Sequence, residues 1–237
     1  MKTTLHKADS RGYVDHGWLK TYHTFSFASY YEPSRVRFGL LRVLNDDIIE
    51  GGMGFGTHPH DNMEIVTIPI EGTLAHKDSM GTKQTLKPGE IQIMSAGSGL
   101  THSEFNNSET ERINLLQIWV FPKERDIEPR YDQKVFDTGE RKNKFQTVVS
   151  PEKENGAMWI NQDAYFSLAD IDKDKELDYK IKQKGNGAYI FVIDGSINTA
   201  NETLGNRDAV GVEDIENIKI KALENSKILL IDVPMRQ

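Results

Sequence analysis

The sequence predicts an all-β protein built from two β-barrels in tandem. Three observations support this prediction: the chain has 237 residues, its apolar residues come in short β-branched runs, and one pattern of runs and turns occurs twice. The length exceeds that of one small barrel and suits two barrels of about 100 residues each. A chain of this size buries enough surface to fold without a disulfide or a structural metal.

Short apolar runs with turn residues between them indicate strands. The runs 65–68, 91–94 and 113–120 are rich in isoleucine, valine and leucine. Turn residues that include glycine separate the runs, at 71–72, 79–81, 87–89 and 97–99. Strands at this spacing are typical of a sandwich or barrel. Residues 163–172 are expected to form a further strand, whereas 208–217 are polar and ambiguous.

A faint internal repeat predicts that the two barrels are related. Residues 68–74 read IPIEGTL and residues 191–197 read FVIDGSI. A leucine and a tight acidic turn follow in both copies, with Arg207 where the first copy has Gly89. The charged segment 122–156, which contains three prolines, suits a boundary. We place this boundary near residue 140, giving domains 1–140 and 141–237.

The composition excludes several classes of protein. No cysteine is present, which excludes a disulfide framework, zinc knuckles and thiol catalysis. The net charge of −7 argues against a nucleic-acid-binding protein, and the basic cluster at 141–144 is expected to be a solvated linker. Residues 1–10 are polar, and the apolar run at 228–231 is far too short for a membrane span. We expect a cytoplasmic monomer with no membrane and no direct nucleic-acid partner.

Two pairs of side chains at i and i+2 predict a metal site. On a strand, His58 and His60 point to the same face, about 6.6 Å apart along the backbone. His102 and Glu104 repeat this spacing, and we expect their strand to supply ligands from the opposite wall of the barrel. Pro59 removes a backbone donor, which places its strand at an edge or an interruption of pairing.

Three imidazoles and one carboxylate, with open positions for water or substrate, suit Fe(II) and related first-row ions. All 7 histidines lie at or before His102, so the second half of the chain has none. The sequence therefore predicts one divalent transition metal in the first barrel, held by His58, His60, His102 and Glu104. Fe(II) is the expected ion, and Mn, Co, Ni, Cu or Zn are alternatives.

The spacing of these residues resembles that of the cupin motifs. Gly52, His58, His60, Glu64 and Gly72 are similar to the first motif. Longer strings resemble pirin-like bicupins and their bacterial quercetin 2,3-dioxygenase members. These strings are residues 15–18 (DHGW), 23–27 (HTFSF), 41–47 (LRVLNDD), 54–60 (GFGTHPH), 76–81 (HKDSMG) and 94–99 (MSAGSG). The resemblance is close over residues 5–125 and loose beyond them.

The resemblance implies a fold and an activity. It implies a bicupin of two tandem jelly-roll barrels, the second without histidine ligands. It also implies a metal-dependent dioxygenase that cleaves flavonols such as quercetin, with dioxygen as co-substrate and release of carbon monoxide. In the pirin-like group the fourth ligand is the Glu two residues after the last histidine, here Glu104, which we also expect to be the catalytic base. Glu64 is the alternative fourth ligand.

Other functions and roles remain open. The chain resembles pirin as well, which implies an iron-binding, redox-responsive module that binds other proteins without turnover. A structural cupin with an empty site is a third possibility. His23 and His76 are expected to be hydrogen-bonded structural residues, and Trp18 and Trp119 to be core residues. Strand alternation permits five further residues to line a metal pocket: Phe25, Phe27, Phe55, Gln92 and Met94.

Overall fold

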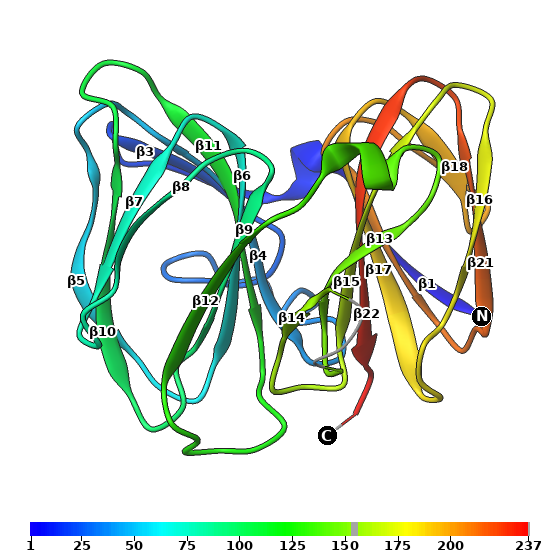
Figure 1. Ribbon diagram of the computed structural model, residues 1–237. Helices are drawn as coiled ribbons and strands as arrows, with labels where there is room; N and C mark the ends of the chain where they lie inside the picture. The colour runs from blue at the N-terminus through cyan, green and yellow to red at the C-terminus, as the bar shows by residue number, and fades with distance from the viewer. Residues whose placement is uncertain (153–155, 237) are drawn as a thin grey trace.

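The computed structural model describes residues 1–152 and 156–236. The protein consists of two β-barrels that lie side by side (Figure 1). Each barrel is formed by one seven-stranded sheet and one four-stranded sheet. The predicted all-β class is thus confirmed. Short 3-10 helices, η1 (Ala8–Ser10) and η2 (Thr138–Arg141), lie in connections. Among the described residues, no helix has the length and apolar character that a membrane crossing requires.

The first barrel follows the chain from β2 to β12. In spatial order, its seven-stranded sheet consists of β12 (Arg130–Val135), β9 (Glu90–Ser95), β6 (Glu64–Glu71), β11 (Ile113–Val120), β4 (Leu41–Ile49), β3 (Leu19–His23) and β2 (Gly12–Asp15). Its four-stranded sheet consists of β5 (Gly54–His60), β10 (Leu100–Asn106), β7 (Leu74–Asp78) and β8 (Lys83–Leu86). β5 is an edge strand, as Pro59 predicts.

The second barrel includes the N-terminal strand. Its seven-stranded sheet consists of β1 (Lys2–His6), β20 (Ala209–Glu213), β17 (Asn186–Asp194), β22 (Ser226–Pro234), β15 (Tyr165–Ile171), β13 (Gln146–Ser150) and β14 (Met158–Trp159). Its four-stranded sheet consists of β16 (Glu176–Lys180), β21 (Asn217–Ala222), β18 (Ile197–Thr199) and β19 (Glu202–Leu204). Because β1 pairs with β20, the second barrel contains one histidine, His6, which bonds Tyr189 Oη at 2.7 Å. The boundary near residue 140 stays a prediction.

The two sequence copies occupy equivalent places in the two barrels. The first copy forms the turn from β6 to β7 and the second forms the turn from β17 to β18. Gly72 and Gly195 have φ of 75° and 90° at these turns, a conformation that glycine adopts without strain. In the turn from β8 to β9, Gly89 has φ 92°, and in the turn from β19 to β20, Arg207 has φ 65°. The repeat is therefore a structural one.

The two seven-stranded sheets pack face to face and form the main core. Buried side chains of both barrels meet there, including Val66 and Leu116 of the first and Phe166, Phe191 and Leu229 of the second. Phe25, which alternation would permit in the metal pocket, lies in this core instead. Apolar burial on this scale makes the barrels one packed unit, since hydrophobic burial is the dominant stabilising term in folding.

The interiors of the two barrels differ in chemistry. Apolar side chains such as Ile190, Val210 and Leu230 fill the second barrel. Polar side chains from facing sheets point into the first barrel, among them Asp47, Gln117 and Glu104. The cavity with titratable groups therefore lies in the first barrel.

Glu64 faces the other barrel and not the first barrel's interior. Glu64 lies two residues before Val66 on β6, so both side chains point to the same face of the sheet. That face joins the core between the two barrels. One carboxylate oxygen accepts bonds from Ser95 Oγ at 2.8 Å and from the backbone N–H of Asn161 at 3.1 Å. The structure therefore does not bring Glu64 to the histidines.

We expect Glu64→Gln to stabilise the protein more at pH 8 than at pH 5. Burial raises the pKa of Glu64 from 4.5 to about 7. Between these values the folded protein keeps a proton that the unfolded chain has lost, so stability falls as the pH rises through this window. The neutral amide avoids this loss, which is at most about 3 kcal/mol. Thermal unfolding at both pH values measures the change in stability that the substitution causes, with the exposed Glu176→Gln as control. An equal shift of the unfolding temperature at both pH values would contradict the expectation.

Candidate metal centre

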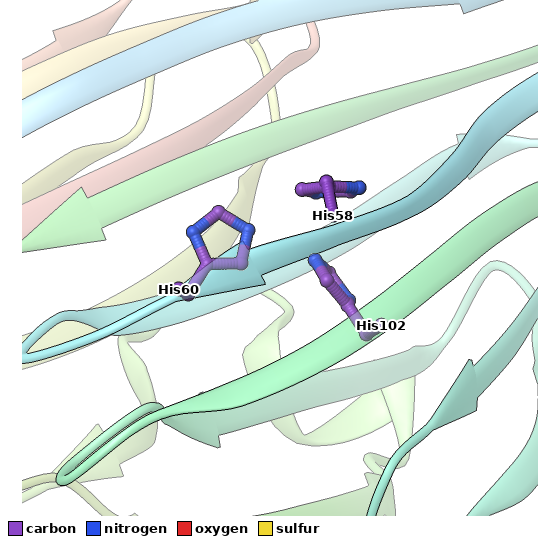
Figure 2. Close-up of side chains that lie close together, drawn as sticks. All are labelled: His58, His60 and His102. Carbon is purple, nitrogen blue, oxygen red and sulfur yellow. The ribbon is translucent and has the colours of Figure 1, made fainter.

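Three imidazoles converge at the edge of the four-stranded sheet (Figure 2). His58 and His60 extend from β5, and His102 extends from β10. The ring centroids are 4.9 Å apart for His58 and His60, 4.4 Å for His58 and His102, and 4.8 Å for His60 and His102. One ring nitrogen from each residue lies within 4.8 Å of the other two. Three donors at such distances can hold one metal ion.

The two ligand-bearing strands are neighbours in one sheet. His102 pairs directly with His58 in the antiparallel ladder of β5 and β10. Our expectation that His102 extends from the opposite wall was therefore wrong. Side chains directly opposite on adjacent strands are only about 5 Å apart at Cβ, which explains the tight cluster.

The state of the rings suits metal binding. His58 Nδ1 lies 2.8 Å from the carbonyl oxygen of Gly56, so its N–H donates there and Nε2 is left to bind an ion. Burial, with the neighbouring histidines, lowers the pKa of His60 to about 4 and that of His102 to about 2. Both rings are therefore neutral at pH 7, and neutral imidazole is the form that binds metals.

Unpaired buried atoms gather at this cluster. Among the described residues, neither ring nitrogen of His102 has a hydrogen-bond partner, and the same holds for Oε1 of Glu104. Buried polar atoms in native proteins are normally paired, and an unpaired one is costly. The donor set thus fits a metal ion, which would satisfy these atoms.

Glu104 is buried, like His102 and unlike the half-buried His58 and His60. Its Oε2 accepts a bond from Gln117 Nε2 at 2.9 Å, and burial, followed by the nearby charge of Asp47, raises its pKa to about 7. Its carboxylate groups with His102 and a further histidine, His76, all within 4.8 Å. The assignment of Glu104 as fourth ligand stays a prediction.

A β-bulge displaces the strand opposite Glu104. His102 pairs with His58, whereas Glu104, two residues on, pairs with Phe55 three residues back. This extra residue in β5 places Phe55 in the cavity together with His58 and His60. Phe55 is three residues from His58, so alternation alone does not permit this placement, contrary to our reading of the sequence.

His76 is a site residue that the sequence did not identify. It is buried on β7 directly opposite Glu104, and its ring centroid is 5.3 Å from that of His102. Its Nε2 lies 3.4 Å from Asp78 Oδ2, so the expected hydrogen-bonded role is confirmed, while Nδ1 has no partner among the described residues. The spacing of His76 and Asp78 repeats that of His102 and Glu104, a signal that was present in the sequence.

The cluster opens into a cavity of about 430 Å³ with aromatic walls. Trp18, Phe27, Phe55 and Trp119 line it. The Trp119 ring lies 4.9 Å from that of His60 and 5.2 Å from that of Phe27. Trp18 and Trp119 are half-buried and pack against small hydrophobic clusters, as expected of core residues, but they also line the cavity. Phe27 and Phe55 line the cavity, as strand alternation was taken to permit.

The cavity also has a polar wall, formed by β3, β4 and β11. His23 Nδ1 bonds Asn45 Oδ1 at 2.9 Å, as expected of a structural histidine, and both residues line the cavity. Asp47 lies beside them, and burial raises its pKa to about 7, opposed by a hydrogen bond from Thr21. The cavity therefore has flat apolar walls, a histidine cluster and two buried carboxyl groups, Asp47 and Glu104.

Two tandem β-barrels, one with a histidine cluster facing its cavity, define a protein of the bicupin class. Residues 4–120 match the family model described as Pirin, and residues 147–233 match that of the quercetinase C-terminal cupin domain. The chain belongs to the pirin family. The predicted family and fold are confirmed.

Three relatives show how far the similarity extends. The chain is 44% identical over 230 residues to quercetin 2,3-dioxygenase of Escherichia coli (strain K12), covering 97% of this chain and 98% of that protein. It is 39% identical over 225 residues to a pirin-like protein of Caulobacter vibrioides, covering 94% and 96%. The crystal structure of bacterial pirin YhhW from Escherichia coli in complex with nickel(II) superimposes with a TM-score of 0.93 at 42% identity, covering 98% and 99%.

Proposed function

We propose that this protein is a metal-dependent dioxygenase that cleaves flavonols such as quercetin by 2,3-dioxygenation with release of carbon monoxide. The observation that supports the proposal is the cluster of three neutral histidines at the wall of an aromatic-lined cavity. The names of the relatives support the substrate class, and the nickel(II) complex of a relative supports a metal at the cluster. A cavity of about 430 Å³ is in the range of small-molecule sites.

Each site residue then has a role. His58, His60 and His102 hold the ion through neutral ring nitrogens, and Glu104 is the fourth ligand. A bound divalent ion, Fe(II) being the expected one, would supply Lewis acidity toward the substrate hydroxyl. Glu104 takes the proton of the flavonol 3-hydroxyl, because it is a carboxylate on the cavity wall next to the cluster. Trp18, Phe27, Phe55 and Trp119 hold the flat rings and exclude water.

Turnover of quercetin tests the proposal. Protein reconstituted without oxygen with Fe(II), and separately with Mn, Co, Ni, Cu or Zn, is mixed with quercetin and dioxygen. We expect carbon monoxide release and oxygen uptake in equal amounts with at least one metal, and loss of both in a His58→Ala/Glu104→Ala variant. Tight metal binding without turnover would contradict the proposal for flavonols and favour the redox-responsive binding module. The monomeric state and the cytoplasmic location stay predictions.

His76→Gln is expected to weaken metal retention about 10–100-fold, the usual effect of losing a partner behind the ligands. The histidine packs behind His102 and Glu104, and its link to Asp78 fixes its ring. Competition with a chelator measures the loss. Lys77→Gln, the exposed neighbour on β7, is the control; equal retention by both variants would contradict this role.

A further inference from the structure

Two neighbouring aspartates of β4 have opposite surroundings. Asp46 points toward the other barrel, where its carboxylate lies 3.4 Å from Arg11 and 3.5 Å from Arg207 and accepts a bond from Asn114 at 2.7 Å. Asp47 points the other way, into the cavity of the first barrel. The contacts of Asp46 therefore join the two barrels, whereas the Asp47 side chain makes no comparable contact between them.

Asp47 is buried but incompletely bonded. It is 2% exposed, and its Oδ1 has no hydrogen-bond partner among the described residues. Thr21 donates a hydrogen bond to the same carboxyl group. Two other polar neighbours are engaged elsewhere, Asn45 with His23 and Gln117 with Glu104. Leaving a buried polar atom unpaired is destabilising, and an apolar residue of similar size would avoid that cost. A carboxyl group at this position is thus suited to a hydrogen-bond donor that arrives with a ligand.

Asp47 and the histidine cluster lie on different walls of the cavity. Asp47 belongs to the seven-stranded sheet, and the three histidines belong to the four-stranded sheet. Facing sheets are about 10 Å apart, so a flat ring system can lie between these two polar points. The aromatic side chains that line the cavity suit the ring faces.

We propose that Asp47 determines substrate specificity by accepting a hydrogen bond from a second hydroxyl group of a planar polyphenol, one that does not reach the metal. The inference rests on the proposed function, because it assumes that a flavonol-like molecule occupies this cavity.

The test compares the binding of two flavonols that differ in their hydroxyl groups. Nickel(II)-loaded protein is titrated without oxygen with quercetin and with 3-hydroxyflavone, which has only the 3-hydroxyl, and the flavonol absorption is followed. The variants are Asp47→Leu, which removes the acceptor, and Asp47→Asn, which keeps a neutral one. Asp178→Asn, an exposed carboxylate on β16, is the control. Metal content and thermal unfolding are measured for every variant.

We expect Asp47→Leu to weaken quercetin binding about 10–100-fold, as for the loss of one hydrogen bond to a charged group, and to leave 3-hydroxyflavone within about 2-fold. We expect the affinity of Asp47→Asn for quercetin to lie between those of wild type and Asp47→Leu. Its affinity for 3-hydroxyflavone should stay unchanged. Equal losses for both flavonols, or no loss for quercetin, would overturn the role of Asp47 while wild-type binding upholds the proposed function. If the wild-type protein binds neither flavonol, the proposed function and this inference both fail.

Discussion

His102→Ala is expected to abolish stoichiometric metal binding. His102 is the one residue common to both donor groups, the first with His58 and His60 and the second with His76 and Glu104. Its removal therefore disrupts either arrangement, and we expect affinity to fall by more than the roughly 100-fold that losing an outer partner causes. Metal content after dialysis against a chelator measures this.

The same variant separates a ligand from a structural residue. Both ring nitrogens of His102 are unpaired in the described structure, so its loss removes no hydrogen bond. We expect metal-free His102→Ala to unfold within about 1 kcal/mol of the metal-free parent, whereas the parent alone gains stability on adding metal. His16→Ala, at the exposed rim of the cavity, is the control for metal retention. Full metal content in His102→Ala would refute the site.

Phe191→Ala is expected to destabilise the whole chain by about 3–5 kcal/mol, as for other large buried aromatic residues. Phe191 is fully buried in the core between the barrels. Although Phe191 belongs to the second barrel, we expect metal release from the first barrel to occur at a lower temperature as well, because both barrels share this core. Phe105 on β10 is 41% exposed, so Phe105→Ala is the control for stability and should stay within about 1 kcal/mol.

Calorimetry and metal release measured on the same samples test this coupling. A Phe191→Ala protein that unfolds in two steps, and whose first barrel keeps its metal up to the parental temperature, would contradict a shared core. In that case the second barrel would be a separate domain that leaves the site unaffected.

The sequence contains enough local information to predict the metal-binding strands but not their partners. Alternation on a strand requires only neighbouring residues, so the pairs at His58 and His60 and at His102 and Glu104 could be recognised. Which strands pair is a long-range property, and it placed β10 beside β5 rather than across the barrel. For the same reason, the sequence did not predict that β1 pairs with β20.

Two further features depend on details that alternation does not reveal. The bulge in β5 brings Phe55 to the cavity side of the strand with His58, and one extra residue leaves no clear mark in a sequence. Glu64 is on a strand with apolar residues on both faces, because that strand is buried by the cavity side and by the second barrel. A pattern without alternation cannot show which way the side chain points.

Anomalous X-ray scattering at the nickel absorption edge, from crystals of the nickel(II)-loaded protein, tests the central claim most directly. We expect one strong peak per chain, about 2 Å from one ring nitrogen each of His58, His60 and His102 and from a carboxylate oxygen of Glu104. A peak held by His76, His102 and Glu104 without His58 and His60, or no peak in the first barrel, would contradict it.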